Sequence, residues 1–138
     1  MTEQTLAIIK PDAVEKRLIG KILAHLEEAG FVIREMRMER LSPERAREFY
    51  AVHAERPFYE SLVEFMTSGP CIPVVLERRD AVSGLRAAIG ATDPAQADEG
   101  TLRRLYAESV ERNVIHASDS TDNAHREVEF FFPETSDR

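Results

Sequence analysis

A regular alternation of strand-like and helical patterns is the feature that most constrains the fold of this chain. An apolar run at residues 6–9 is broken by Pro11, which predicts a short buried strand. Over residues 19–29 the apolar side chains recur with helical spacing, and Gly30 is suited to end that helix. Residues 31–41 then alternate apolar and charged side chains, which predicts a strand with one solvated face.

The alternation continues after residue 41. Ser42 followed by Pro43 is typical of a helix start. Residues 71–77 form an apolar, strand-like run in which Pro73, having no N–H, predicts an irregularity or a free edge. Asp80 is expected to cap a helix that Gly90 ends. The other expected elements are helices from residue 43 to 50, from 57 to 68, from 102 to 106 and from 120 to about 131, and a strand around His116.

This order of elements is βαββαβ with extra short helices. It predicts an α+β fold of the ferredoxin-like type, a four-stranded antiparallel sheet with helices packed on one face. A length of 138 residues suits one domain, so residues 1–138 are expected to form a single unit. Two helices cannot cover both faces of such a sheet, and we therefore expect part of it to pack against another copy of the chain.

Charge and cysteine content limit the possible partners. The net charge of -7 argues against broad attraction to nucleic acid or to anionic lipid, so a bound phosphate would require a small basic cleft. The single Cys71 excludes an internal disulfide and a multi-cysteine metal site, and its apolar surroundings predict a buried, unreactive thiol. No basic segment precedes a long apolar one and no stretch could span a bilayer, so we expect a cytoplasmic protein without a membrane partner.

His116 stands within the segment Asn-Val-Ile-His-Ala-Ser-Asp-Ser, residues 113–120, among short polar side chains. A neutral imidazole is a good nucleophile when one ring nitrogen is free and an acceptor holds the other. The alternative is that His116 only ends a strand, with Ser118 and Asp119 in a turn and Ser120 capping the next helix.

Further polar side chains occur at element ends and in loops, where a cleft can collect them. Guanidinium groups bind phosphate oxygens in a bidentate fork, and hydroxyl, amide and ammonium groups add further donors. As a set they suit a polyphosphate, although any one of them could be an ordinary surface residue. The chain has no G-x-x-x-x-G-K-[ST] or G-x-G-x-x-G segment, so it would have to bind a nucleotide by side chains. The set is Lys10, Tyr50, His53, Arg56, Arg86, Thr92, Arg103 and Asn113.

Together these segments resemble the nucleoside diphosphate kinases. Residues 113–120 are close to that family's N-x-x-H-G-S-D-S motif. The resemblance extends in the right order from residue 5 to about residue 132. The other matching segments are Thr-Leu-Ala-Ile-Ile-Lys-Pro-Asp at 5–12, Phe-Tyr at 49–50, His53 with Arg-Pro-Phe at 56–58, Thr-Ser-Gly-Pro at 67–70, Gly-Ala-Thr-Asp-Pro at 90–94 and Gly-Thr-Leu-Arg at 100–103.

The resemblance implies a ping-pong kinase. The γ-phosphate of a nucleoside triphosphate would pass to His116 as a phosphohistidine and then to a nucleoside diphosphate, with Mg²⁺ bridging the phosphates. Mg²⁺ would be held mainly by the nucleotide, and no protein side chain is expected to bind it. By the same resemblance, Lys10 and Asn113 would bind the ribose and phosphates, Tyr50, Arg86, Thr92 and Arg103 would surround the transferring group, Phe58 and Val110 would clamp the base, and Ser118 and Glu127 would orient His116.

Several positions depart from the family pattern. Ala117 replaces the usual glycine, and a positive φ there would cost roughly 1 kcal/mol. Arg78 stands where glycine commonly follows the acidic residue, and Arg104-Leu105 replaces a small-acidic pair. These departures lie near surfaces that assemble subunits in the family. The short segment after Phe132 and the bacterial-looking motifs lead us to expect a homo-oligomer that is a tetramer rather than a hexamer.

Two readings from other classes remain open at this stage. A ferredoxin-like domain can bind RNA on sheet-face aromatic residues, but the acidic charge and the absence of such an aromatic segment count against a dedicated nucleic-acid site. His116 could instead accept a phosphoryl group in a signalling relay without a nucleotide site. That reading leaves Arg86, Thr92, Arg103 and Phe58 unexplained.

Overall fold

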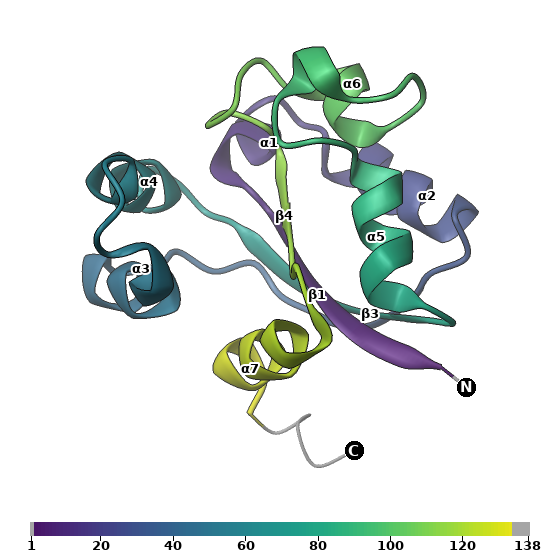
Figure 1. The fold of residues 1–138 in the computed structure, drawn as a ribbon, viewed down its shortest axis with the longest axis horizontal. Coiled ribbons are helices and arrows are strands. Elements are labelled where there is room, and N and C mark those ends of the chain that lie inside the picture. Colours follow the sequence, from purple (N-terminus) through teal and green to yellow (C-terminus); the bar gives the residue numbers. More distant parts are fainter. Residues whose placement is uncertain (1, 134–138) are drawn as a thin grey trace.

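The computed structural model of the chain describes residues 2–133 and contains a four-stranded antiparallel sheet in the order β2-β3-β1-β4 (Figure 1). The predicted ferredoxin-like α+β fold is confirmed. The elements are β1 (Glu3–Ile9), α1 (Pro11–Glu15), α2 (Ile19–Glu28), β2 (Val32–Met36), α3 (Pro43–Phe49), the 3₁₀ turn η1 (Ala51–His53), α4 (Tyr59–Met66), β3 (Ile72–Arg78), α5 (Ala81–Ile89), the 3₁₀ turn η2 (Pro94–Gln96), α6 (Leu102–Tyr106), β4 (Ile115–Ala117) and α7 (Thr121–Phe131).

Helices cover both faces of the sheet, and the prediction of helices on one face was wrong. Successive side chains of a strand point to opposite faces, and in β1 both sets are apolar and buried. Ala7 and Ile9 join a core with α2 and α5, whereas Leu6 and Ile8 join a second core with α3, α4 and α7. Figure 1 shows α2 and α5 on one side of the sheet and α3, α4 and α7 on the other. Both faces of β1 are therefore covered by helices of the same chain, and the uncovered sheet face that we expected is not found at this strand.

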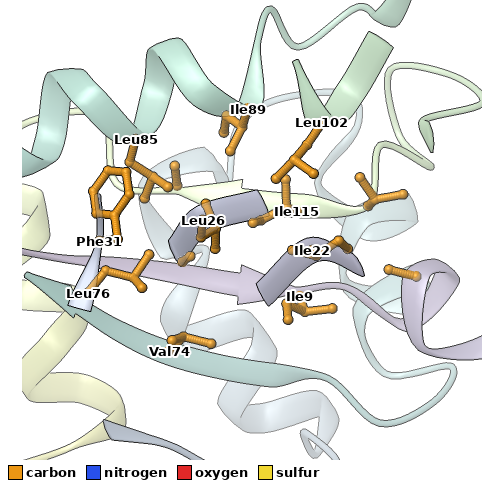
Figure 2. Packing of buried hydrophobic residues seen from close by; sticks show 14 of the residues in the cluster. Ile9, Ile22, Leu26, Phe31, Val74, Leu76, Leu85, Ile89, Leu102 and Ile115 are labelled. Carbon is orange, nitrogen blue, oxygen red and sulfur yellow. The ribbon is translucent and has the colours of Figure 1, made fainter. Parts of the chain in front are cut away.

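The core between the sheet and α2 and α5 is built from branched aliphatic side chains (Figure 2). Ile22 and Leu26, which are one helical turn apart on α2, lie over the strands in the same core as Leu85 of α5. Burying side chains of this kind stabilises a fold by about 1.5–3 kcal/mol each. This layer gives a rigid support to the β4 strand that carries His116.

Local signals set most helix ends as predicted. Ser42 accepts a hydrogen bond from the Arg45 N–H, and Ser120 accepts one from the Asn123 N–H. Gly30 follows α2 with φ 93°. Asp80 is different, because it precedes α5 with φ 53° and its side chain makes no capping hydrogen bond. Glu3 takes over that role by accepting the Val82 N–H at 2.8 Å, so Asp80 was wrongly predicted as the capping group.

Regular β2–β3 pairing ends at Val74, next to Pro73, where an irregularity was predicted. A separate bulge between Ile33 and Glu35 lies opposite Leu76 and Val75 and was not predicted. Pro73 nevertheless lies in a central strand, since β3 also pairs with β1, so the free-edge alternative was wrong. β2 is the edge strand, and it ends earlier than predicted, at Met36. Of its apolar side chains only Ile33 packs against a core, whereas Val32, Met36 and the following Met38 are exposed, unlike what the alternation suggested.

Within residues 2–133, no helix combines the length and the apolar composition that crossing a bilayer requires.

The packing of α5 against α6 depends on a close approach at Gly90. Gly90 has φ 88° and ψ 178°, a backbone conformation that is essentially restricted to glycine. A Cβ added there would lie 2.5 Å from Thr101 Oγ1 and 2.8 Å from Thr101 Cβ. Gly100 shares a positive φ of 84°, but a Cβ there would meet nothing within 4 Å.

These two glycines make a matched pair for a stability test. Gly100→Ala should lower the free energy of unfolding by about 1–2 kcal/mol, because only the backbone conformation is penalised. Gly90→Ala should lower it by clearly more, since the clash with Thr101 is added. Urea denaturation of the two variants measures the difference, and equal losses would contradict the close approach at Gly90.

Candidate active site

A pocket of about 500 Å³ lies where the two helical layers meet the end of the sheet. Its walls come from the α3–α4 region, from α5 and α6, from β4 and from α7. It collects all but one of the side chains to which the resemblance assigns a role: Lys10, Tyr50, Phe58, Arg86, Thr92, Arg103, Val110, Asn113, His116 and Glu127. Ser118 lies buried behind His116 rather than in the wall, and Arg56 of the wider polar set does not line the pocket.

His116 is held from behind by Glu127. Its Nε2 lies 2.8 Å from Glu127 Oε1, and the same oxygen accepts a 2.7 Å hydrogen bond from Ser118 Oγ. Burial raises the pKa of Glu127, but the hydrogen bonds from His116 and Ser118 outweigh it, and the pKa falls below its usual range. An ionised carboxylate can only accept, so Nε2 carries a proton. In neutral His116 the lone pair therefore lies on Nδ1, which no hydrogen bond within residues 2–133 engages.

Two aromatic rings limit the orientation of the imidazole. The centroid of the Phe49 ring lies 5.5 Å from that of the His116 ring, and the two ring planes make an angle of 73°. The centroid of the Tyr50 ring lies 6.3 Å from that of His116, with an angle of 89° between the planes. Burial raises the pKa of Tyr50, with nearby Cys71 and Glu127 acting in the same direction. Tyr50 therefore stays protonated and offers a neutral hydroxyl donor beside His116.

Lys10 and Asn113 form a buried polar pair. The Lys10 Nζ donates to Asn113 Oδ1 at 2.8 Å and to the Glu111 carbonyl at 3.1 Å. The Asn113 amide donates in turn to the carbonyls of Val110 and Thr92. Burial lowers the pKa of Lys10 to about 8, so the ammonium form persists only up to mildly alkaline pH. Asn113 thus joins the base of the pocket to the two loops at its rim.

Arg103 and Arg86 give this part of the pocket a positive charge. Arg103 is buried, and it donates to the Ile115 carbonyl at 2.6 Å and to the Gly90 carbonyl at 3.1 Å. Its Nε has no hydrogen-bond partner within the described residues. Burial, and then the charge of Arg86, lowers the pKa of Arg103 to about 10, so the group is charged at neutral pH. Two guanidinium groups close enough to repel each other provide a site for an anion.

The pocket mouth is apolar. Phe58 and Val110 both line it and keep 48% and 55% of their surface exposed. The centroid of the His53 ring lies 5.5 Å from that of the Phe58 ring, so the two rings pack against each other. Exposed apolar side chains flanking a cleft mark a site for a flat apolar ligand group.

Sequence reasoning missed part of the lining. Asp119, Asn123 and Arg126 lie at the α7 side of the pocket, and Asn123 Nδ2 donates to Asp119 Oδ1 at 2.6 Å. Asn123, Arg126 and Glu127 lie on neighbouring turns of one face of α7, and Asp119 just precedes that helix, a signal that could have been read once Glu127 was assigned. Glu111, which also lines the pocket, gives no such signal because it lies in a loop.

The departures at Ala117 and Arg78 are accommodated without strain at the site. Within residues 2–133 only Arg17, Asp80 and Val114 combine a side chain with a positive φ, so Ala117 has no such penalty. It pairs with Ala7 in the extended strand β4. Arg78 lies over the Phe31 ring and donates to the Ala29 carbonyl at the end of α2.

The described residues bring no three His, Cys, Asp or Glu side chains together as metal ligands. The cations that line the pocket are Lys10, Arg86, Arg103 and Arg126, and the carboxylates of Glu111, Asp119 and Glu127 line it as well. The N–H groups of these cations suit phosphate oxygens.

The tautomer of His116 can be measured directly. In neutral His116, the ¹⁵N NMR spectrum should show a protonated Nε2 and an unprotonated Nδ1, because Glu127 holds the Nε2 proton. Glu127→Gln should weaken this preference and give a mixture of tautomers. Glu129→Gln, an exposed change on the same helix, should leave the spectrum of His116 unchanged. A protonated Nδ1 in the unmodified protein would contradict the geometry.

Comparison with known proteins leads to the same family as the motifs. The family model described as nucleoside diphosphate kinase matches residues 3–136. The nucleoside diphosphate kinase of Chlorobium limicola is 58% identical over 130 residues, which cover 94% of this chain and 93% of that protein. The nucleoside diphosphate kinase of Chlorobaculum tepidum is 59% identical over 130 residues, which cover 94% of this chain and 93% of that protein.

Solved structures agree. The Aquifex aeolicus nucleoside diphosphate kinase superposes with a TM-score of 0.94 at 46% identity, covering 96% of each chain. The Encephalitozoon cuniculi nucleoside diphosphate kinase superposes with a TM-score of 0.91 at 36% identity, covering 94% of this chain and 88% of that one. A profile over almost the whole chain, high identity and a matching fold give one conclusion: this chain belongs to the nucleoside diphosphate kinase family.

Proposed function

We propose that this chain carries out the family's phosphoryl transfer through His116 as a single catalytic domain spanning residues 1–138. The observation that supports it most is a histidine held through Nε2 by Glu127 and facing a pocket lined by Lys10, Arg86 and Arg103. This arrangement leaves a nucleophilic nitrogen beside groups that bind phosphate. A relay histidine would have no use for the three cations.

In the first half-reaction, the Nδ1 lone pair of His116 attacks the γ-phosphorus of the triphosphate. The bond from that phosphorus to the bridging oxygen breaks, and the diphosphate leaves with the electron pair. The Nε2 proton stays in place, so the imidazole ring becomes cationic and the Glu127 carboxylate balances its charge. In the second half-reaction, a terminal oxygen of another diphosphate attacks the phosphorus, and the N–P bond breaks with its electrons returning to Nδ1.

We assign the other pocket residues according to their chemistry. Arg86 and Arg103 would hold the oxygens of the transferring phosphoryl group, and Thr92 and the protonated hydroxyl of Tyr50 would donate to it. Lys10 and Asn113 would bind the ribose and the inner phosphates. Phe58 and Val110 would enclose the base between apolar surfaces, which grips any base without reading its edge. Ser118 would act with Glu127 to orient His116.

Mg²⁺ would enter on the nucleotide as part of the substrate. The chemistry it would supply there is neutralisation of phosphate charge. The protein's part is then to place its cations and His116 around that complex. We further propose a cytoplasmic location, which suits a reaction on free nucleotides and the buried, unpaired Cys71.

Labelling tests the nucleophile. The protein mixed with γ-labelled ATP and no diphosphate should become labelled, and the label should be lost in acid and survive alkali, as expected for a phosphoramidate. Any nucleoside diphosphate should discharge it. His116→Ala should take no label while still binding nucleotide, because the cations remain.

His125→Ala provides the matched control, since this exposed histidine lies on α7 outside the pocket lining. It should label at the normal rate. Acid-stable label, or label that persists in His116→Ala, would show that another residue is the nucleophile.

We also propose a symmetric homo-oligomer, with a tetramer favoured over a hexamer. The support now comes from the edge strand β2 and the residues after it, where Val32, Met36 and Met38 are exposed together. Exposed apolar side chains on a sheet edge favour association with another copy.

Light scattering at micromolar concentration should give four times the chain mass of 15.6 kDa. Met36→Lys should lower the measured mass, because it puts a charge into the apolar edge. A stable monomer before substitution would refute the assembly.

A further inference from the structure

The backbone at Val114, two residues before His116, is strained. Val114 has φ 67° although it is β-branched and fully buried. The Ile115 N–H donates to the Asn113 carbonyl at 2.9 Å, which closes a tight turn of three residues centred on Val114. Conformations of this kind cost about 1–3 kcal/mol each and persist only where the surroundings hold them.

This turn changes which side chains face the pocket. In a regular strand, neighbouring residues point to opposite faces. Here Val114 and Ile115 are neighbours and yet both lie in the same hydrophobic core. Asn113 and His116, on either side of them, both line the pocket. A straight strand through these four residues could not place the amide and the imidazole on one wall with both aliphatic side chains in the core.

Asp12 is one of the groups that hold the turn. Its Oδ2 accepts the Val114 N–H at 3.1 Å, and the Lys10 N–H donates to the Val114 carbonyl at 2.9 Å. Both polar groups of the strained residue are therefore held by one short segment that follows β1. Asp12 is only 1% exposed, and its other oxygen has no hydrogen-bond partner within the described residues. Burying a carboxylate is costly, and the phosphoryl transfer described above does not use this one.

We propose that Asp12 is a positioning residue for the phosphoryl transfer: its carboxylate holds the Val114 peptide in the strained turn and so keeps His116 and Asn113 on one wall of the pocket. The inference rests on the proposed function for its kinetic consequence. Asp12 is not among the residues that line the pocket, so it acts on His116 and Asn113 through the backbone of Val114.

The same carboxylate also acts on Lys10 by its charge. The pKa of Lys10 is lowered to about 8, mainly by burial and also by the charge of Arg103, while the charges of Asp12 and Glu111 oppose this shift. Removing the charge at Asp12 would therefore lower the pKa of Lys10 further. Nucleotide binding that needs the ammonium form should then decline at a lower pH than in the unmodified protein. A loss of packing alone would not move this decline.

Three variants separate these effects. Asp12→Ala removes both the acceptor and the charge, and at saturating ATP it should slow labelling of His116 by about a hundredfold, the size expected for a small misplacement of a catalytic group. Asp12→Asn keeps a weaker, neutral acceptor, so its loss should be about tenfold, with the decline in binding moved to lower pH. Glu15→Gln removes the same charge from an exposed position on α1 and should change neither property.

Amide hydrogen exchange at Val114 gives a readout that does not depend on activity. The Val114 amide should exchange slowly in the unmodified protein and faster in Asp12→Asn, and faster still in Asp12→Ala if that variant folds. If the unmodified protein takes no label from ATP, the proposed function fails, and the exchange data still decide whether Asp12 holds the turn. A folded Asp12→Asn with the normal labelling rate, normal pH dependence and unchanged Val114 exchange would overturn the inference.

Discussion

Two-sided burial of β1 is the constraint on which the rest of this structure depends. Each face of the strand supports a separate core, one with α2 and α5 and the other with α3, α4 and α7. Slipping the strand by one residue would exchange its two faces, so its register is strongly determined. Lys10 follows directly from its end, and Ile8 pairs with His116. The strand therefore sets the positions of the buried cation and of the nucleophile together.

Burial of charge is the second element of the design. Lys10, Arg103 and Glu127 are all removed from water, and each is compensated by hydrogen bonds: Lys10 to Asn113, Arg103 to two carbonyls, Glu127 from Ser118 and His116. Groups held in this way need no rearrangement when charge develops on a phosphoryl group. The pKa of Glu127 is lowered and that of Tyr50 is raised, so Glu127 stays ionised and accepts hydrogen bonds while Tyr50 stays neutral and can donate one.

Where sequence reasoning failed, a distant group had replaced a local one. Asp80 stands at the start of α5 as predicted, yet Glu3 from β1 accepts the Val82 N–H there. Helices were expected on one face, although the continuous apolar run of β1 is typical of a strand buried on both faces; that run does not say whether helices of this chain or another copy cover the second face. Asp12 received no role from its motif, because its partner Val114 lies 102 residues away in the chain.

The sequence by itself determined the order of the elements, the helix ends at Ser42, Gly30 and Ser120, and the chemical types of the site residues. These depend on periodicity, on capping and on motifs, all of which act within a few residues. Only the tertiary structure decided the tautomer of His116, the lowered pKa of Lys10 and the strained turn at Val114. Each of these follows from burial or from a partner far away along the chain, so the physical cause exists only once the two helical layers have closed around the sheet.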